Sequence, residues 1–191
     1  MAKLTFYGAT EGVTGSAYLL ETERSTILLE CGLYQGSREE EEANNEPFPF
    51  DINKIDAVVL SHAHLDHSGR LPKLIADGYS GRLYMTYATS ELLEIMLKDA
   101  ASLQQRDTEW ENKRRRRAGK KEIEPLYDMD DVETALASCD GFAYGQRHEV
   151  AAGVEVCFRD AGHILGSSIV EVFINEAGAE KKLVFSGDLG N

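Results

Sequence analysis

Ser61-His62-Ala63-His64-Leu65-Asp66-His67-Ser68-Gly69 is the stretch on which the fold and the chemistry of this chain depend. Three of the five histidines in 191 residues lie within it, together with one carboxylate. It directly follows the apolar run 55–60, which is typical of a buried strand. Neutral imidazole and carboxylate are ligands that zinc accepts, and manganese or iron are alternatives where oxygen ligands contribute. We therefore expect a metal site here rather than a solvated, histidine-rich turn.

The spacing within this stretch indicates how its ligands divide. Side chains alternate along an extended segment, so His62, His64 and Asp66 can face one way. His67 can turn inward only if the backbone curls. The loop therefore offers two imidazoles to one ion, and a carboxylate plus an imidazole to its neighbour.

The sequence before the loop predicts strands. Three short apolar segments at 4–8, 16–21 and 25–30 are joined by short links, which predicts an antiparallel meander. The polar run 38–42, with four consecutive glutamates, is expected to be a solvated loop.

The sequence after the loop alternates between helix and strand patterns. A short helix is expected at 71–78, and a longer one begins at Thr89 or Ser90 and runs toward Trp110. A stripe of apolar side chains at helical spacing predicts core packing for the longer helix: Leu92, Leu93, Met96, Leu97, Ala100 and Leu103. A third helix is expected from Asp130 or Asp131 through Leu136.

Further strands are expected at 83–86, 154–159, 168–174 and 182–186. These elements together predict sheets packed on each other, with helices outside.

Two later residues share the signature of the histidine-rich loop. His163 and Asp188 are metal-capable, flanked by glycines, and placed at the ends of apolar strands. With His62, His64, Asp66 and His67 they make six candidate ligands, all at strand ends. His148 lacks this context and is expected to be exposed.

The chain resembles the metallo-β-lactamase superfamily, through His62, His64, Asp66 and His67. It resembles more specifically the β-CASP branch of RNA-processing nucleases, whose motifs match at 12–16, 61–72, 161–167 and 186–190. The resemblance implies an α/β fold, a metallo-β-lactamase-like αββα sandwich, with residues 1–191 as an N-terminal domain segment. We expect this sandwich to be incomplete, because the family inserts its β-CASP domain at this point and returns later to finish it.

The resemblance also implies roles for the candidate ligands. His62, His64 and His163 would hold one zinc, Asp66 and His67 the second, and Asp188 would bridge them. A hydroxide shared by the metals would attack an RNA phosphodiester, with Asp66 orienting it. The backbone amides of Ser68 and Gly69, where a helix begins, are expected phosphate contacts.

The chain departs from the family pattern in two respects. Glu30 stands where the family usually has Asp, in a position that supports the metal loop from behind. Apart from His148, no further histidine remains to complete the shell of the second zinc. We therefore expect an inactive segment of a longer enzyme, with exposed apolar surface that favours self-association.

The charge of the chain bears on whether it binds nucleic acid. The formal net charge of −13 argues against a surface that grips nucleic acid everywhere. However, residues 113–121 hold seven of the twenty Lys and Arg residues. They form either a phosphate-contacting patch or a solvated helix end and loop.

No apolar run could span a bilayer and no signal peptide is recognisable, so we expect a cytoplasmic protein without membrane contact. The three cysteines, Cys31, Cys139 and Cys157, are widely spaced and expected to be reduced structural thiols.

Two other functions remain open from the sequence. The same metal loop could serve a hydrolase of small molecules such as thioesters or lactams. Alternatively, the chain could be a non-catalytic scaffold subunit of an RNA-processing complex, although that function predicts replaced ligand positions and all six are present.

Overall fold

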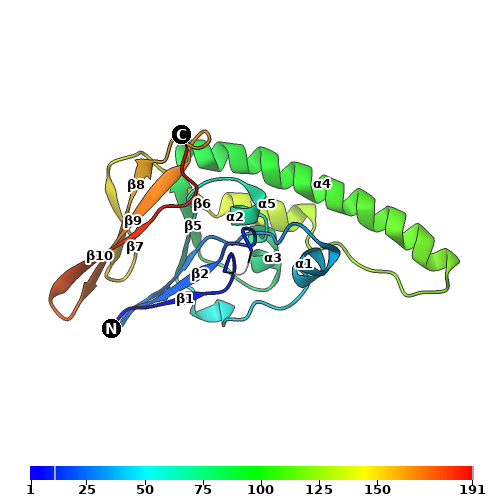
Figure 1. The fold of residues 1–191 in the computed structure, drawn as a ribbon, viewed down its shortest axis with the longest axis horizontal. Coiled ribbons are helices and arrows are strands. Elements are labelled where there is room, and N and C mark those ends of the chain that lie inside the picture. Colours follow the sequence, from blue (N-terminus) through cyan, green and yellow to red (C-terminus); the bar gives the residue numbers. More distant parts are fainter. Residues whose placement is uncertain (11, 191) are drawn as a thin grey trace.

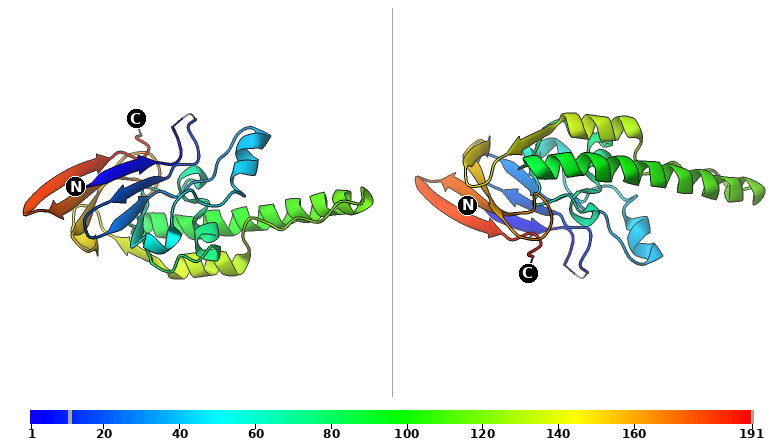
Figure 2. Two further views of the ribbon diagram at one scale, coloured as in Figure 1. Left: turned by 90° about the horizontal axis from the view of Figure 1, so that it is seen from below. Right: turned by 90° about the horizontal axis from the view of Figure 1, so that it is seen from above.

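Two β-sheets lie against each other, and helices cover the outer face of one of them (Figure 1). The structure is a computed structural model that describes residues 1–10 and 12–190. Figure 2 shows the same layers from above and below, with the long helix α4 extending past the rest of the molecule. This confirms the predicted α/β sandwich of the metallo-β-lactamase type, with helices on one side in the described part of the chain.

The first sheet has six strands in chain order: β1 (Lys3–Phe6), β2 (Tyr18–Glu21), β3 (Thr26–Leu29), β4 (Ala57–Val59), β5 (Arg82–Thr86) and β6 (Cys139–Phe142). β1, β2 and β3 pair antiparallel, as the short links between them predict. β3 to β6 pair in parallel, so the carboxyl ends of β3, β4 and β5 meet at one edge. That edge carries the histidine-rich loop.

The second sheet is antiparallel in the order β10-β9-β8-β7. Its strands are β7 (Arg147–Ala151), β8 (Val154–Asp160), β9 (Ser168–Glu176) and β10 (Ala179–Phe185). The sequence did not predict β6 or β7. Both are short and carry polar or glycine residues where an apolar alternation would be needed to recognise them.

The helices are α1 (Arg38–Ala43), the 3₁₀ turn η1 (Ile52–Lys54), α2 (Leu65–Ser68), α3 (Leu71–Ala76), α4 (Tyr87–Arg117) and α5 (Met129–Ala137). The prediction of a loop at 38–42 is wrong, because Ser37 and Glu40 form a capping box that starts α1. The predicted start of α4 is also late by a few residues. Thr86 is its N-cap, and its hydroxyl also reaches the carbonyl of Gly166 at 2.7 Å.

The central strands of the first sheet divide their side chains between two cores. In β3, Leu28 packs toward α3, α4 and α5, while Ile27 and Leu29 pack against the second sheet. Val156 and Phe158, on the inner face of β8, belong to the same core as Ile27 and Leu29. Burial on both faces explains why β3 and β4 read as continuous apolar runs.

The apolar stripe of α4 is buried only near the sheet. Leu93 and Leu97 are fully buried, whereas Leu103 is 45% exposed. Beyond this point the helix leaves the body and continues to Arg117, further than the predicted end near Trp110. Lys and Arg are good helix formers, and cations are favoured in a last helical turn.

The outer face of the second sheet is covered by charged pairs. Glu171 accepts hydrogen bonds from Arg159 (2.9 Å) and from Lys182. Arg147 pairs with Glu180 (2.9 Å) and lies over the ring of Phe173.

Self-association through exposed apolar surface stays a prediction. In the part of the chain that the structure describes, none of the helices has the length and apolar character that crossing a membrane requires.

Candidate metal centre

β4 delivers the histidine-rich loop to the edge of the sheet, as predicted. The strand is buried throughout, and the buried Leu60 leads from it to Ser61 and His62, which are buried as well. His64 is the N-cap of α2, and this single helical turn provides the backbone curl that brings His67 inward. The turn packs closely on the end of β3, since a Cβ on Gly32 would lie 1.7 Å from the carbonyl oxygen of Asp66. Only glycine fits there.

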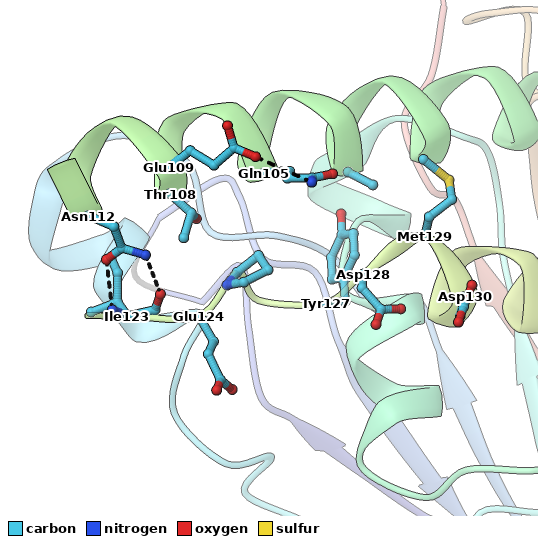
Figure 3. A pocket seen from close by; sticks show the side chains of 12 residues that line it. Gln105, Thr108, Glu109, Asn112, Ile123, Glu124, Tyr127, Asp128, Met129 and Asp130 are labelled. Carbon is cyan, nitrogen blue, oxygen red and sulfur yellow. Dashed lines mark hydrogen bonds between the residues drawn. The ribbon is translucent and has the colours of Figure 1, made fainter. Parts of the chain in front are cut away.

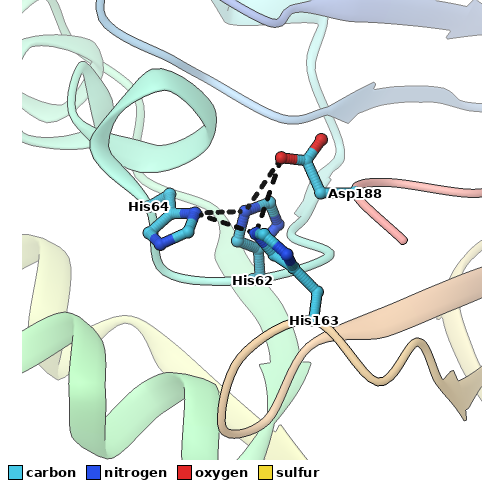
Figure 4. Close-up of side chains that lie close together, drawn as sticks. All are labelled: His62, His64, His163 and Asp188. Atoms are coloured by element: carbon cyan, nitrogen blue, oxygen red, sulfur yellow. Dashed lines mark hydrogen bonds and ion pairs between the residues drawn. The ribbon is translucent and has the colours of Figure 1, made fainter. Parts of the chain in front are cut away.

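Three imidazoles converge in the first cluster, although they come from distant parts of the chain (Figure 4). Nε2 of His62 lies 3.0 Å from Nδ1 of His64, and Nε2 of His163 lies 3.2 Å from the same Nδ1. His163 follows β8, about a hundred residues after the other two. These two distances bring together the first three ligands expected from the sequence.

Asp188 lies between this cluster and His67. Its Oδ2 is 3.6 Å from Nε2 of His163 and 4.0 Å from Nε2 of His62. Its Oδ1 is 3.4 Å from Nε2 of His67, whose Nε2 is also 3.6 Å from Oδ2 of Asp66. We call His67 and Asp66 the second cluster. Asp188 therefore faces the first cluster with Oδ2 and the second with Oδ1, as a bridging carboxylate would.

Glu30 supports the loop from behind, in the place predicted for it. Its fully buried carboxylate accepts hydrogen bonds from the amide of Ser61 (2.6 Å), the hydroxyl of Ser61 (2.8 Å) and Nδ1 of His67 (2.5 Å). The residue adopts φ 63°, a backbone conformation that is unusual for a residue other than glycine. Glutamate can therefore serve where the family usually has Asp.

Ser61 is a part of this network that sequence reasoning missed. Its hydroxyl donates to Glu30 and also lies 2.9 Å from Nδ1 of His62. Because the hydroxyl hydrogen points to Glu30, its oxygen can accept from Nδ1–H of His62, which leaves Nε2 of His62 free to bind a metal. Likewise, Nδ1–H of His67 donates to Glu30 and leaves its Nε2 facing the carboxylates. The only signal in the sequence was a hydroxyl directly before the first histidine.

The electrostatics of the cluster favour neutral imidazole at the deepest ligand. Burial, together with the nearby rings of His67, His64 and His163, lowers the pKa of His62 to about 3. Burial also acts against the charged form of His67. The hydrogen bond and charge of Glu30, together with the charges of Asp66 and Asp188, outweigh burial and raise the pKa of His67. A metal site needs neutral imidazole, so His62 is ready to bind across the physiological range.

The donor set fits a divalent metal such as zinc. Tetrahedral zinc with nitrogen ligands at about 2.0–2.1 Å would separate them by about 3.3 Å. This is close to the distances from Nδ1 of His64 to Nε2 of His62 (3.0 Å) and to Nε2 of His163 (3.2 Å). The ligand atoms of His62, His64, His163 and Asp188 all lie within 4.8 Å of one another. Four imidazoles and two carboxylates thus surround a space suited to cations.

The loop that carries His163 is fixed by hydroxyl groups. The side chain of Ser167 accepts hydrogen bonds from the amides of His163 (3.1 Å) and Ile164 (3.2 Å). Ser168 joins this loop to the metal loop, because its amide and its hydroxyl both donate to the carbonyl of Ser61. Gly187 permits the approach of Asp188, since it has φ 53° and a Cβ there would lie 2.6 Å from the hydroxyl of Ser61.

A cavity of about 290 Å³ opens beside the second cluster. His67 and Asp188 line it together with Ser16, Tyr18 and Phe185. A substrate group placed there would lie against the side of the centre that holds a single imidazole.

The predicted phosphate contacts are not supported. The amide of Ser68 donates to the carbonyl of His64 (3.0 Å), and that of Gly69 donates to the carbonyl of Leu65 (2.8 Å). Both residues are buried, so neither amide is free for a phosphate. The helical turn that positions His67 uses these donors itself.

His148 is outside the centre, as predicted, but it is not exposed. Its ring stacks on Phe142 with centroids 3.8 Å apart, and the side chain is partly buried.

The three cysteines are free, also as expected. Burial raises the pKa of Cys31 to about 12 and that of Cys139 to about 11.

This geometry agrees with similarity to known proteins. A family model described as the metallo-beta-lactamase superfamily matches residues 10–155. The chain belongs to the metallo-β-lactamase superfamily. This confirms the membership that the metal-loop motif predicted.

The chain is also similar to a ribonuclease and to transcription termination factors, in agreement with the resemblance seen in the sequence. Ribonuclease TTHA0252 of Thermus thermophilus is 42% identical over 185 residues, which cover 97% of this chain and 37% of that protein. Transcription termination factor FttA of Methanosarcina mazei is 32% identical over 191 residues, covering 97% of this chain and 27% of the factor. The chain therefore spans about a third of the length of these relatives.

A solved metallo-β-lactamase of Cronobacter sakazakii, described by its HARLDQ motif, has the same fold. It superposes with a TM-score of 0.55 at 21% identity, covering 94% of this chain and 55% of that one. At this identity the likeness concerns the fold alone.

Proposed function

We propose that this chain forms the metal centre of a zinc-dependent hydrolase that cleaves RNA phosphodiester bonds. The observation that carries the proposal is the position of Asp188 between two ligand clusters, one of three imidazoles and one containing His67 and Asp66. The similarity to a ribonuclease over nearly the whole chain supports RNA as the substrate.

Each side chain has a distinct task in this proposal. His62, His64 and His163 would hold the first zinc, Asp66 and His67 would hold the second, and Asp188 would contribute to both. Zinc, when bound, supplies Lewis-acid activation of water and stabilises charge on the phosphate oxygens. Manganese or iron could replace it at the same nitrogen and oxygen ligands.

Other side chains of the protein would position the attacking water and the phosphodiester. Asp66 is 23% exposed and faces the same space as His67, so it can orient the attacking water through a hydrogen bond. Glu30 and Ser61 keep the imidazoles in the tautomers that the metals require. The cavity next to His67 and Asp188 would receive the phosphodiester.

We further propose that the 191-residue chain by itself binds metal without rapid turnover. Within residues 1–10 and 12–190, His67 is the only imidazole that belongs to the second cluster alone, because His62 beside it also faces His64 in the first cluster. Among the described histidines, His148 does not supply another ligand here, because it is stacked on Phe142. A second zinc would therefore have fewer imidazole ligands than the first.

The alternative functions have weaker support. The similarity to solved β-lactamases concerns the fold alone, so it does not favour a lactam or thioester substrate. A non-catalytic scaffold predicts loss of ligands, whereas all six candidate side chains are present and face one space.

Metal analysis and hydrolysis assays test the proposal together. The zinc content of the purified chain is measured by mass spectrometry for the wild type and for His64→Ala, with His148→Ala as a matched control outside the centre. We expect loss of zinc with His64→Ala only. RNA cleavage is then assayed on a form of the protein that matches its relatives in length, with and without Asp66→Ala.

The outcomes separate the three functions. RNA cleavage that Asp66→Ala abolishes supports the nuclease. Hydrolysis confined to thioesters or lactams supports the small-molecule enzyme, and the absence of both activities supports the scaffold.

A further inference from the structure

The far end of α4 is a basic surface that the metal centre does not use. Residues 113–121 hold seven of the twenty Lys and Arg residues and no Asp or Glu, in a chain of net charge −13. Figure 1 shows this end extending well beyond the two sheets. We call the exposed side chains of Trp110, Lys113, Arg114, Arg117 and Lys120 the α4 tip.

One helical face of the α4 tip combines cations with an aromatic ring. Trp110, Lys113, Arg114 and Arg117 follow the i, i+3, i+4, i+7 spacing, so they lie on the same side of the helix. All four are exposed, with Trp110 at 60%. The guanidinium of Arg114 lies over the indole, 4.9 Å from the ring centroid.

The opposite face of this helix end is already occupied. The returning chain is fastened to it by Asn112, whose side chain makes two hydrogen bonds with the backbone of Ile123, at 2.8 and 2.9 Å (Figure 3). Arg115 donates to the carbonyl of Lys121 at 2.6 Å. These contacts hold the helix end in shape and leave the face of Trp110 open.

Several cations of the α4 tip have no carboxylate to neutralise them. Arg114 pairs with Glu111 and Arg116 pairs with Glu122. Among the described residues, no ion pair forms to Lys113, Arg117 or Lys120. Such unpaired charges repel one another, and a polyanion would relieve that repulsion.

We propose that the α4 tip is a docking site for single-stranded RNA, with phosphates on Lys113, Arg117 and Lys120 and a base stacked on Trp110. Basic grooves that carry aromatic rings bind single strands in this way, largely without regard to sequence. The proposal rests on the proposed function insofar as that function supplies RNA as the ligand. An acidic protein could satisfy the charges but would make no use of the exposed indole.

The position of the site suggests what docking does. The first turn of α4 is fixed near the metal centre, because Thr89 donates to the carbonyl of Gly166 at 2.8 Å, close to His163. The helix has 31 residues and is therefore about 46 Å long. RNA held at the α4 tip would lie far from the metals, so the tip increases the local concentration of substrate without taking part in its hydrolysis.

The test uses the fluorescence of Trp110, which is the only tryptophan in the sequence. The chain is titrated with oligouridylate, and binding is followed by tryptophan emission and by anisotropy of the labelled RNA at several salt concentrations. We expect quenching of Trp110. We also expect Lys113→Ala/Arg117→Ala/Lys120→Ala to reduce the slope of log affinity against log salt by about 2.

Controls separate charge at the tip from charge elsewhere. Lys3→Ala/Arg38→Ala/Lys54→Ala removes three exposed cations from other parts of the surface and should leave both readouts unchanged. Trp110→Leu should weaken binding about tenfold, while Trp110→Phe should restore most of it.

The test also separates this proposal from the zinc nuclease. His62→Ala should abolish zinc binding yet retain the quenching of Trp110, whereas the tip variants should retain zinc. Binding of RNA without quenching, equal salt slopes for the tip and control variants, or equal quenching by polyglutamate would overturn the proposal.

Discussion

Replacing Ser61 with alanine should weaken metal binding, although Ser61 is not expected to touch the metal. The fully buried hydroxyl donates to Glu30 at 2.8 Å and lies 2.9 Å from Nδ1 of His62. Its removal leaves Nδ1 of His62 without a partner and deprives the carboxylate of one donor. His62 can then rotate or change tautomer, which moves Nε2 away from its place beside His64.

The size of the effect follows from these contacts. Loss of a partner behind a histidine ligand typically reduces metal affinity about 10- to 100-fold, or about 1.4–2.7 kcal/mol. A hydrogen bond to a buried carboxylate contributes about 1.5–3 kcal/mol to stability. We therefore expect the metal-free variant to unfold more easily by about that amount.

Ser68→Ala is the matched control. Ser68 is equally buried, but its hydroxyl donates to the carbonyls of Ala63 (3.1 Å) and His64 (3.0 Å) and contacts no ligand side chain. Zinc affinity is measured by competition with a chromophoric chelator, and stability by urea denaturation of the metal-free protein. If Ser61→Ala binds zinc as tightly as Ser68→Ala, the hydroxyl does not position His62 and our reasoning about the tautomers is refuted.

Three other predictions concern the rest of the fold. Lys182 and then Arg159 hold the pKa of Glu171 below its ordinary value of 4.5, so Glu171→Gln should cost up to about 1 kcal/mol in urea denaturation at pH 7. This cost should diminish as the pH falls below 4.5 through the lowered pKa, and an equal cost at pH 3.5 and 7 would contradict it. Cys31, whose pKa is raised to about 12 by burial, should resist a thiol reagent at pH 8 until urea unfolds the chain; rapid labelling of the native protein would be inconsistent with its burial. Leu97→Ala, at a fully buried position of α4, should lower the free energy of unfolding by about 2–5 kcal/mol, whereas a loss below 1 kcal/mol would show that α4 does not pack on the sheet as described.

The sequence predicted the elements whose patterns are strong. β3, β4 and β9 are marked by dense apolar runs, and α3 by proline near its first turn and glycine after its end. β6 and β7 were missed because they are short and half polar. Helix α1 was missed because a run of glutamates resembles a solvated loop until the capping box at Ser37 is recognised.

The metal ligands that lie close together in the sequence were predictable. The residues and backbone groups that support these ligands were less so. The sequence grouped His62, His64 and His67 in one loop, and similarity of context added His163 and Asp188. It could not show that the amides of Ser68 and Gly69 are used within α2, because that depends on the three-dimensional path of the turn. The same holds for Ser61, whose role depends on the left-handed backbone that turns Glu30 toward it.

Zinc-edge anomalous diffraction from crystals of the zinc-loaded chain would test the metal centre most directly. Our account predicts a strong peak bounded by Nε2 of His62, Nδ1 of His64 and Nε2 of His163, with any weaker second peak on the His67 side of Asp188. A map with no peak among these nitrogens, or with zinc bound only elsewhere, would contradict it.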